Sequence, residues 1–173
     1  IDKAGLADFT ASMLREGTKT RTSLQLAEQL DDLAARLSGG AMSETSRLRL
    51  NCLKETLPAS LDLMVDVLLN PAFRAEDLER VRGLLLTQLV QKKANPGALA
   101  RDEQSRIFWG DKHPWGQPEG GTPATVKSIT AADLGKFHQT WYRPNNAIIA
   151  VSGDVSADEI QKLLDARLTA WKA

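Results

Sequence analysis

The chain has 173 residues, of which 42% are hydrophobic and 25% charged, and its 22 lysines and arginines balance 22 aspartates and glutamates. This length suits one domain with a sizeable core, and the balanced charge argues against a nucleic-acid-binding protein, which usually carries a basic stripe. No segment approaches the ~20 apolar residues that a membrane-spanning helix needs, so we expect no membrane span.

The first predicted element is a helix that begins near Gly5 and ends at Gly17, because glycine commonly follows the last turn of a helix. Its apolar residues recur at helical spacing and are Leu6, Phe9 and Met13. A second stripe at helical spacing consists of Asp8, Ala11, Ser12 and Arg15. We therefore expect one face of this helix to be buried and the second stripe to form another surface.

The next predicted elements are a helix over residues 23–37 and two strands over residues 41–45 and 47–53. Thr22-Ser23-Leu24-Gln25 has the pattern of a capping box at the start of the helix, and Gly39-Gly40 are interpreted as the residues that stop it. Apolar and polar residues alternate in the second segment, which indicates a half-buried strand.

Six further helices and one strand complete the predicted order. The helices are delimited by capping residues, proline and glycine, and are expected over residues 57–69, 76–94, 98–108, 122–129 and 130–140, with a last helix after Ser156. A short apolar run over residues 147–152 is interpreted as a buried strand. This order predicts an α+β domain in which helices pack on one face of a mostly antiparallel sheet.

Cysteine and histidine are rare in this chain. Cys52 is the only cysteine, which excludes an internal disulfide and a cysteine-based metal cluster. Its place in an alternating strand predicts a small buried side chain rather than a nucleophile. We expect His138 at the surface or rim of a helix. His113 lies two residues after Asp111, but a zinc site needs at least three convergent ligands, so this pair alone does not indicate one.

Residues 5–19 resemble the helix that carries the zinc motif His-x-x-Glu-His in the pitrilysin/insulinase (M16) metallopeptidases. Nine residues match the frame of that helix, namely Gly5, Leu6, Ala7, Phe9, Met13, Leu14, Gly17, Thr18 and Lys19. The three chemical positions differ, since Asp8 stands at the first histidine, Ala11 at the glutamate and Ser12 at the second histidine. A His-Pro-aromatic-Gly stretch at residues 113–116 and a Tyr-x-Pro-Asn-Asn stretch at residues 142–146 extend the resemblance over nearly the whole chain.

A third zinc ligand of the family is a glutamate on a later helix. When the chain is matched on Asn95-Pro96, which follows that helix, the Glu-Glu pair of the family falls on Thr87 and Gln88. A catalytic zinc needs about three protein ligands and an open position for water, and a nearby glutamate takes the proton of that water. Ala11 cannot accept a proton and Ser12 is a poor zinc ligand. The resemblance therefore implies that the helix of the zinc motif is present but that its zinc ligands and general base are lost.

The resemblance also implies a fold and a domain organisation. We expect residues 1–173 to form a single M16 peptidase-like half-domain (LuxS/MPP-like) that is a fragment or processed product of a longer chain, because it starts at Ile1. Family domains begin with strands before the zinc-motif helix. We expect these N-terminal strands to be missing here, which leaves a sheet edge without its partner.

Two interpretations of the degenerate positions remain open. In the first, Asp8, Ser12, Thr87 and Gln88 are relics of a lost site. In the second, Asp8, Ser12 and Gln88 line the floor of a groove and contact an extended peptide. In active relatives a substrate strand adds to a sheet edge beside the zinc helix, and this mode relies on backbone hydrogen bonds and needs no metal.

The resemblance implies a non-catalytic M16 domain or subunit that forms part of a substrate chamber, binds peptide and has no cofactor of its own. Zinc is expected only in a catalytic M16 half or subunit that pairs with it, with a homo-oligomer as the alternative. Two other functions stay open: an active zinc peptidase with non-standard ligands, and a scaffold that binds neither zinc nor peptide. The family suggests the bacterial periplasm, with the cytoplasm as the alternative.

Overall fold

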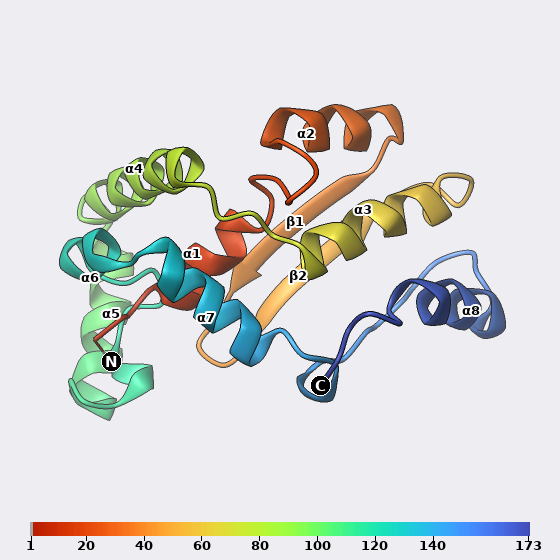
Figure 1. The fold of residues 1–173 in the computed structure, drawn as a ribbon. Coiled ribbons are helices and arrows are strands. Elements are labelled where there is room, and N and C mark those ends of the chain that lie inside the picture. The colour runs from red at the N-terminus through yellow and green to blue at the C-terminus, as the bar shows by residue number, and fades with distance from the viewer. Residues whose placement is uncertain (1) are drawn as a thin grey trace.

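The computed structural model describes residues 2–173, and helices dominate it (Figure 1). The elements in chain order are α1 (Leu6–Met13), α2 (Ser23–Asp32), β1 (Arg36–Ala41), β2 (Ser46–Asn51), α3 (Leu57–Leu69), α4 (Ala75–Lys92), α5 (Pro96–Trp109), η1 (Pro114–Gly116), α6 (Pro123–Ser128), α7 (Ala131–Trp141), η2 (Pro144–Asn146) and α8 (Ala157–Arg167). No helix within residues 2–173 is long and apolar enough to cross a membrane.

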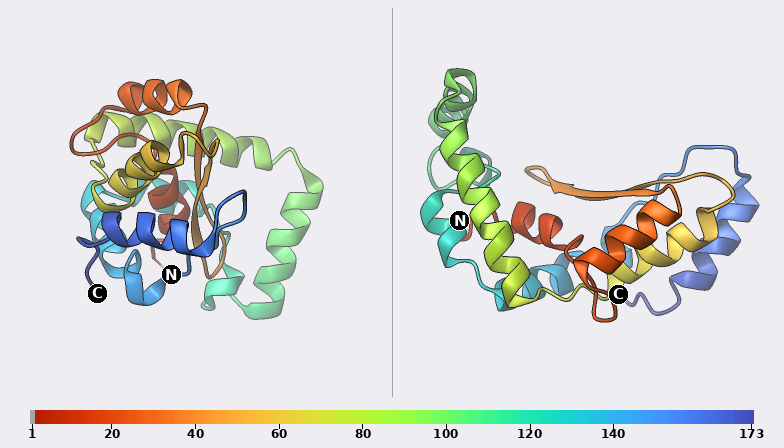
Figure 2. Two further views of the ribbon diagram at one scale, coloured as in Figure 1. Left: turned by 90° about the vertical axis from the view of Figure 1, so that its right-hand side faces the viewer. Right: turned by 90° about the horizontal axis from the view of Figure 1, so that it is seen from above.

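The strands β1 and β2 form an antiparallel pair in which Arg36 faces Asn51 and Ala41 faces Ser46. Helices α1, α2 and α3 contact this hairpin, and Figure 2 shows them on one side of it, whereas α5 extends past its edge on the other side. This arrangement confirms the predicted α+β class with helices on one face of an antiparallel sheet.

Two apolar clusters hold the helices together. The first joins the apolar face of α1 to α4, α6 and α7 and contains Phe9, Met13, Leu78, Val81, Leu85, Val126, Ile129 and Leu134. The second joins α2, β1 and α3 and contains Leu14, Leu26, Leu37, Leu63 and Val67. Phe73 packs against both clusters. Each fully buried large side chain contributes roughly 1.5–3 kcal/mol, so α1 is fixed by its buried face, as its sequence predicts.

Most predicted helices are confirmed, because their ends carry capping chemistry. Thr22 caps α2 and Thr130 caps α7, and each forms a capping box with the residue three positions later. The bounds of α3 are those predicted, with Pro58 in the first turn. Helices α4 to α7 lie within two residues of their predicted ends.

The predicted extension of α2 to residue 37 is wrong. Ala34 has φ 48°, its amide donates to the Asp31 carbonyl, and the Ala35 amide donates to the Leu30 carbonyl. These two bonds form a Schellman motif, which usually carries glycine at the left-handed position. Alanine occupies that position here, so the sequence does not mark the end of the helix, and Leu37 lies in β1 instead.

The first predicted strand is also displaced. Gly39-Gly40 lie inside β1 rather than stopping a helix, and residues 42–45 form the hairpin turn, in which the Met42 amide donates to the Thr45 carbonyl at 2.8 Å. The second strand is confirmed to within two residues at each end. Cys52 follows β2 and is only half-buried, so the expectation of a buried core cysteine is wrong.

The predicted strand over residues 147–152 does not form among the described residues. This segment pairs with no strand within residues 2–173, and Ile148 is 96% exposed. A strand is stabilised by hydrogen bonds to a neighbouring backbone and by cross-strand side-chain contacts. An apolar sequence without such a neighbour has the composition of a strand but not its pairing.

Candidate functional site

Helix α1 begins where two distant segments approach closely. Gly5 has φ 89°, and a Cβ atom on it would lie 2.8 Å from the Gly120 carbonyl oxygen. Gly121 has φ 74°, and its Cβ atom would lie 2.3 Å from the Ala4 carbonyl oxygen. Both distances are too short for any side chain, so these glycines let the loop before α6 lie against the start of α1.

The middle of α1 contacts β1 equally closely. A Cβ atom on Gly39 would lie 2.6 Å from the Ala11 carbonyl oxygen, and Ala11 is fully buried. Gly39 is therefore required for the packing of a helix on a strand, which explains a glycine inside β1. At Ala11, where the resemblance places the general base, the structure has a buried methyl group and no proton acceptor.

Asp8 lies half-buried beside the end of β1, where the backbone amide of Ala41 donates a hydrogen bond to its carboxylate. Burial raises the pKa of Asp8, the Ala41 hydrogen bond partly offsets this effect, and the nearby carboxylate of Glu119 adds to it. Asp8 therefore binds the edge of β1 rather than standing free as a metal ligand.

Glu119 was not among the residues that the sequence predicts for this site. Its carboxylate accepts hydrogen bonds from the Ser43 amide at 3.0 Å and from the Ser43 hydroxyl at 2.7 Å. These contacts join the loop before α6 to the hairpin turn. Glu119 lies in a segment rich in proline and glycine without periodicity, so only the long-range packing brings it near Asp8.

Ser12 and Gln88 lie on different helices, α1 and α4. Ser12 follows Asp8 by four residues on α1 and is half-buried. Gln88 follows Val81 and Leu85 by seven and three residues, so it continues the face of α4 that packs against α1, although its side chain is exposed. Within residues 2–173 no side-chain hydrogen bond joins Gln88 to Asp8 or Ser12.

Thr87 points away from this face. It is exposed, and its hydroxyl donates to the Gly83 carbonyl of the same helix at 2.9 Å. The predicted positions thus gather on two helices, but only Asp8 supplies a carboxylate. No group of three His, Cys, Asp or Glu residues within residues 2–173 is placed to hold a metal ion. The residues at this site therefore do not fit a catalytic zinc, which needs about three such ligands.

Comparison with known families explains why a helix of this form lies here. The model described as insulinase (peptidase family M16) matches residues 2–114, and the model described as the peptidase M16 inactive domain matches residues 128–173. The chain belongs to the M16 peptidase family. This family membership confirms the resemblance that residues 5–19 carry.

Relatives of this M16 chain include an uncharacterized zinc protease of Mycobacterium leprae, 30% identical over 161 residues that make up 93% of this chain and 36% of that protein. A peptidase M16 inactive domain from Pseudomonas fluorescens superposes with a TM-score of 0.88 at 26% identity, over 98% of this chain and 41% of the other. The periplasmic protease PqqL from Escherichia coli has the same fold, with a TM-score of 0.82 at 23% identity over 99% of this chain and 20% of the other. The M16 chain thus spans little more than a third of the length of the curated relative.

The two histidines of the M16 chain have structural partners. His138, which the sequence places at the surface or rim of a helix, is half-buried. Its Nε2 atom donates to the Leu68 carbonyl at 2.8 Å, and its ring stacks on Tyr142. Burial lowers the pKa of His138. His113 is exposed, and its Nδ1 atom accepts a hydrogen bond from the Trp115 amide at 3.2 Å. Neither histidine joins a metal-binding group within residues 2–173.

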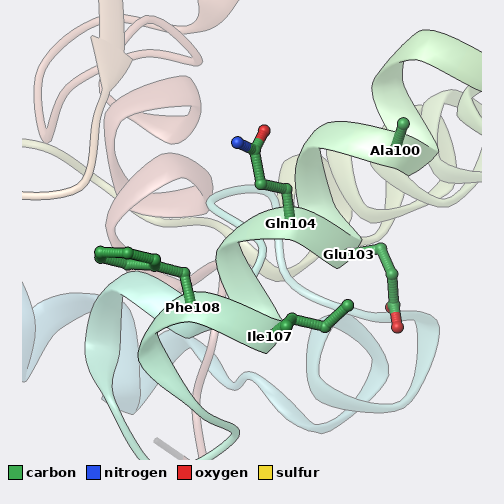
Figure 3. Close-up of a pocket in the computed structure, with 5 residues that line it drawn as sticks. All are labelled: Ala100, Glu103, Gln104, Ile107 and Phe108. Carbon is green, nitrogen blue, oxygen red and sulfur yellow. The ribbon is translucent and has the colours of Figure 1, made fainter.

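A second surface feature is a shallow hollow on α5. Figure 3 shows Gln104 and Phe108 on one side of the helix and Glu103 and Ile107 on the other. The guanidinium of Arg106 binds the Glu103 carboxylate. This carboxylate is the only acidic group lining the hollow, so the hollow contains no paired acid and base for hydrolysis.

Proposed function

We propose that this chain is a non-catalytic M16 domain that forms one wall of a substrate chamber and binds an extended peptide, while a zinc-bearing M16 half or subunit performs the cleavage. The proposal rests on two features that α1 combines. The helix keeps its frame and its packing against β1, but the positions of its zinc motif hold Asp8, Ala11 and Ser12.

The peptide would bind along the free edge of β1. The Met42 amide donates to the Thr45 carbonyl, so these two residues form a hydrogen-bonded pair. Hydrogen-bonded and non-hydrogen-bonded pairs alternate along an antiparallel ladder. The amides and carbonyls of Leu37, Gly39 and Ala41 therefore point away from β2. Asp8 accepts the Ala41 amide. The edge groups of Leu37 and Gly39 make no hydrogen bond beyond the hairpin within residues 2–173, which suits a strand added by main-chain pairing.

The site residues take limited roles in this proposal. Asp8 and Ser12 flank the added strand on α1, and Gln88 contacts it from α4, whereas Ala11 and Thr87 take no part. The chain holds no zinc, and the metal and the general base belong to the partner. The periplasm of a bacterium is the proposed compartment, since one relative of the same fold is a periplasmic protease.

The first experiment measures zinc and hydrolysis in the isolated chain. The protein is loaded with zinc, desalted and subjected to elemental analysis, and a quenched fluorescent peptide is used to follow cleavage. We expect no stoichiometric zinc and no cleavage. One zinc per chain, together with hydrolysis that a chelator abolishes, would overturn the proposal in favour of an active peptidase.

The second experiment measures peptide binding by fluorescence anisotropy. An unfolded peptide should bind. Two versions of it carry N-methyl groups on alternate residues, one on the odd and one on the even positions. Only the version whose methylated amides would face β1 should lose binding, because methylation removes those hydrogen-bond donors. The peptide methylated in the other register is the matched control, because the amides that face β1 are unchanged in it. Failure of every peptide to bind would leave the scaffold as the better function.

A further inference from the structure

The face of the hairpin opposite α1, α2 and α3 is basic. Antiparallel pairing places Arg36 opposite Asn51, Ser38 opposite Arg49, and Gly40 opposite Arg47. Residues directly opposite each other share a face, and the alternate set, with Leu37 and Leu50, packs against the helices. Arg36, Arg47 and Arg49 therefore lie together on the outer face, and all three are exposed.

These three arginines have no acidic partner in the part of the chain that the structure describes. Ion pairs elsewhere in residues 2–173 join Arg21 to Asp66 and Arg167 to Asp62, whereas no carboxylate lies within ion-pair distance of the hairpin arginines. Glu44, in the turn, is the only acidic residue of the hairpin. The outer face thus carries an uncompensated positive charge.

The residues between these arginines and the free edge of β1 are small. On β1, Gly40 is the cross-strand partner of Arg47, and Ser38 is that of Arg49. Both are small, so neither blocks an arginine side chain that extends from β2 across β1. A strand added at that edge would lie two strand spacings from β2, or about 10 Å. Arg36 is on β1 itself and would be its immediate neighbour.

We propose that the peptide bound at the edge of β1 is acidic, with aspartate or glutamate at alternate positions that face the outer side of the hairpin. This inference rests on the function proposed above and names the class of its ligand. The guanidinium groups of Arg36, Arg47 and Arg49 bind these carboxylates, for which the planar fork of arginine is well matched. Asp8 and Glu119, beside Ala41, disfavour a further acidic side chain at that end of the strand.

The test compares three peptides of equal length that alternate the same apolar residues with Glu, Gln or Lys. Binding to the full chain is measured by fluorescence anisotropy at low and physiological salt. We expect the Glu peptide to bind about fivefold to tenfold more tightly than the Gln peptide, as a few exposed ion pairs would provide, with a smaller difference at higher salt. The Lys peptide should bind most weakly.

A double variant, Arg47→Gln with Arg49→Gln, should reduce the preference for Glu over Gln while the Gln peptide binds as before. Arg101→Gln with Lys127→Gln removes the same charge from exposed sites elsewhere and should leave the preference unchanged. Equal binding of all three peptides, or tightest binding of the Lys peptide, would overturn the acidic preference and leave edge binding intact. Absence of binding by every peptide would instead overturn the proposed function on which the preference rests.

Discussion

Strands are predicted over residues 41–45, 47–53 and 147–152, but only the first two fall in a region that forms paired strands, the hairpin over residues 36–51. The hairpin supplies its own neighbour, because a short turn folds β2 back on β1. The second run, over residues 147–152, has a more apolar sequence but no strand neighbour within residues 2–173. The difference shows that strand composition predicts a tendency, whereas pairing requires a second backbone.

The largest expected difference between the two regions concerns their apolar side chains. Leu37 is buried in the second cluster, so Leu37→Ala should lower the free energy of unfolding by about 2–5 kcal/mol. Ile148 is almost fully exposed, so Ile148→Ala should change it by less than about 0.5 kcal/mol. Urea unfolding measures both values. Similar losses for the two variants would mean that residues 147–152 are packed.

The two glycines of β1 provide a sharper test of the contact between α1 and the hairpin. Gly39→Ala places a methyl group against the Ala11 carbonyl and should cost about 1–3 kcal/mol. At Gly40 nothing lies within 4 Å of the added atom, so Gly40→Ala should be neutral or stabilise the protein by up to about 1 kcal/mol. Equal effects in chemical denaturation would contradict the close approach of the helix.

Hydrogen exchange compares the two backbones directly. The amides of Ser38 and Gly40 face β2, so they should exchange at least about tenfold more slowly than the amides of residues 148–151, which lack such partners. Exchange followed by NMR or mass spectrometry measures this ratio. Equal protection would show that the second run pairs in solution.

The smallest expected effect concerns Asp8 at the end of β1. Its pKa is raised above 3.8 in the folded protein, so the folded state holds the proton more tightly than the unfolded state. The contribution of Asp8 to stability is therefore greatest below pH 3.8 and is lost as the pH rises through the folded pKa. Asp8→Asn keeps an acceptor for the Ala41 amide and should remove this loss.

Unfolding measured at pH 4.5 and pH 7 tests that expectation. The variant should be at least as stable as the unmodified protein at pH 7, with a smaller advantage at pH 4.5. Glu28→Gln is the control, because Glu28 is exposed and makes no ion pair within residues 2–173. An Asp8→Asn variant that is less stable at pH 7 would contradict the assignment of a buried, destabilised carboxylate.

The sequence predicted those parts of the fold whose signals are local. Thr22 and Thr130 mark helix starts through their own hydroxyls, and Pro58 marks the first turn of α3. The end of α2 depends on Ala34 in a conformation that usually requires glycine, and the role of Gly39 depends on a carbonyl 28 residues earlier in the chain. These features arise from packing, so a local pattern could not reveal them.

The same limit applies to the candidate site. Helical spacing correctly placed Asp8 and Ser12 on one side of α1, and alternation correctly placed Arg47 and Arg49 on the polar side of β2. The sequence did not indicate that Asp8 binds the Ala41 amide or that Glu119 lies nearby. Both contacts join segments far apart in the chain, and the second also depends on the glycines that let the loop before α6 approach α1.

The placement of the aromatic residues around His113 has a practical consequence for spectroscopy. Trp109 stacks on His113 with ring centroids 5.0 Å apart, Trp115 lies 5.5 Å from Trp109, and all three rings belong to the segment from α5 to η1. Trp141 is exposed, and no tryptophan belongs to either apolar cluster. Trp171, half-buried near the C-terminus, donates its Nε1 proton to the Tyr142 carbonyl at 2.9 Å. Intrinsic fluorescence of this protein would therefore report local changes at α5, η1 and the C-terminal segment, and circular dichroism at helical wavelengths would be the better measure of global unfolding.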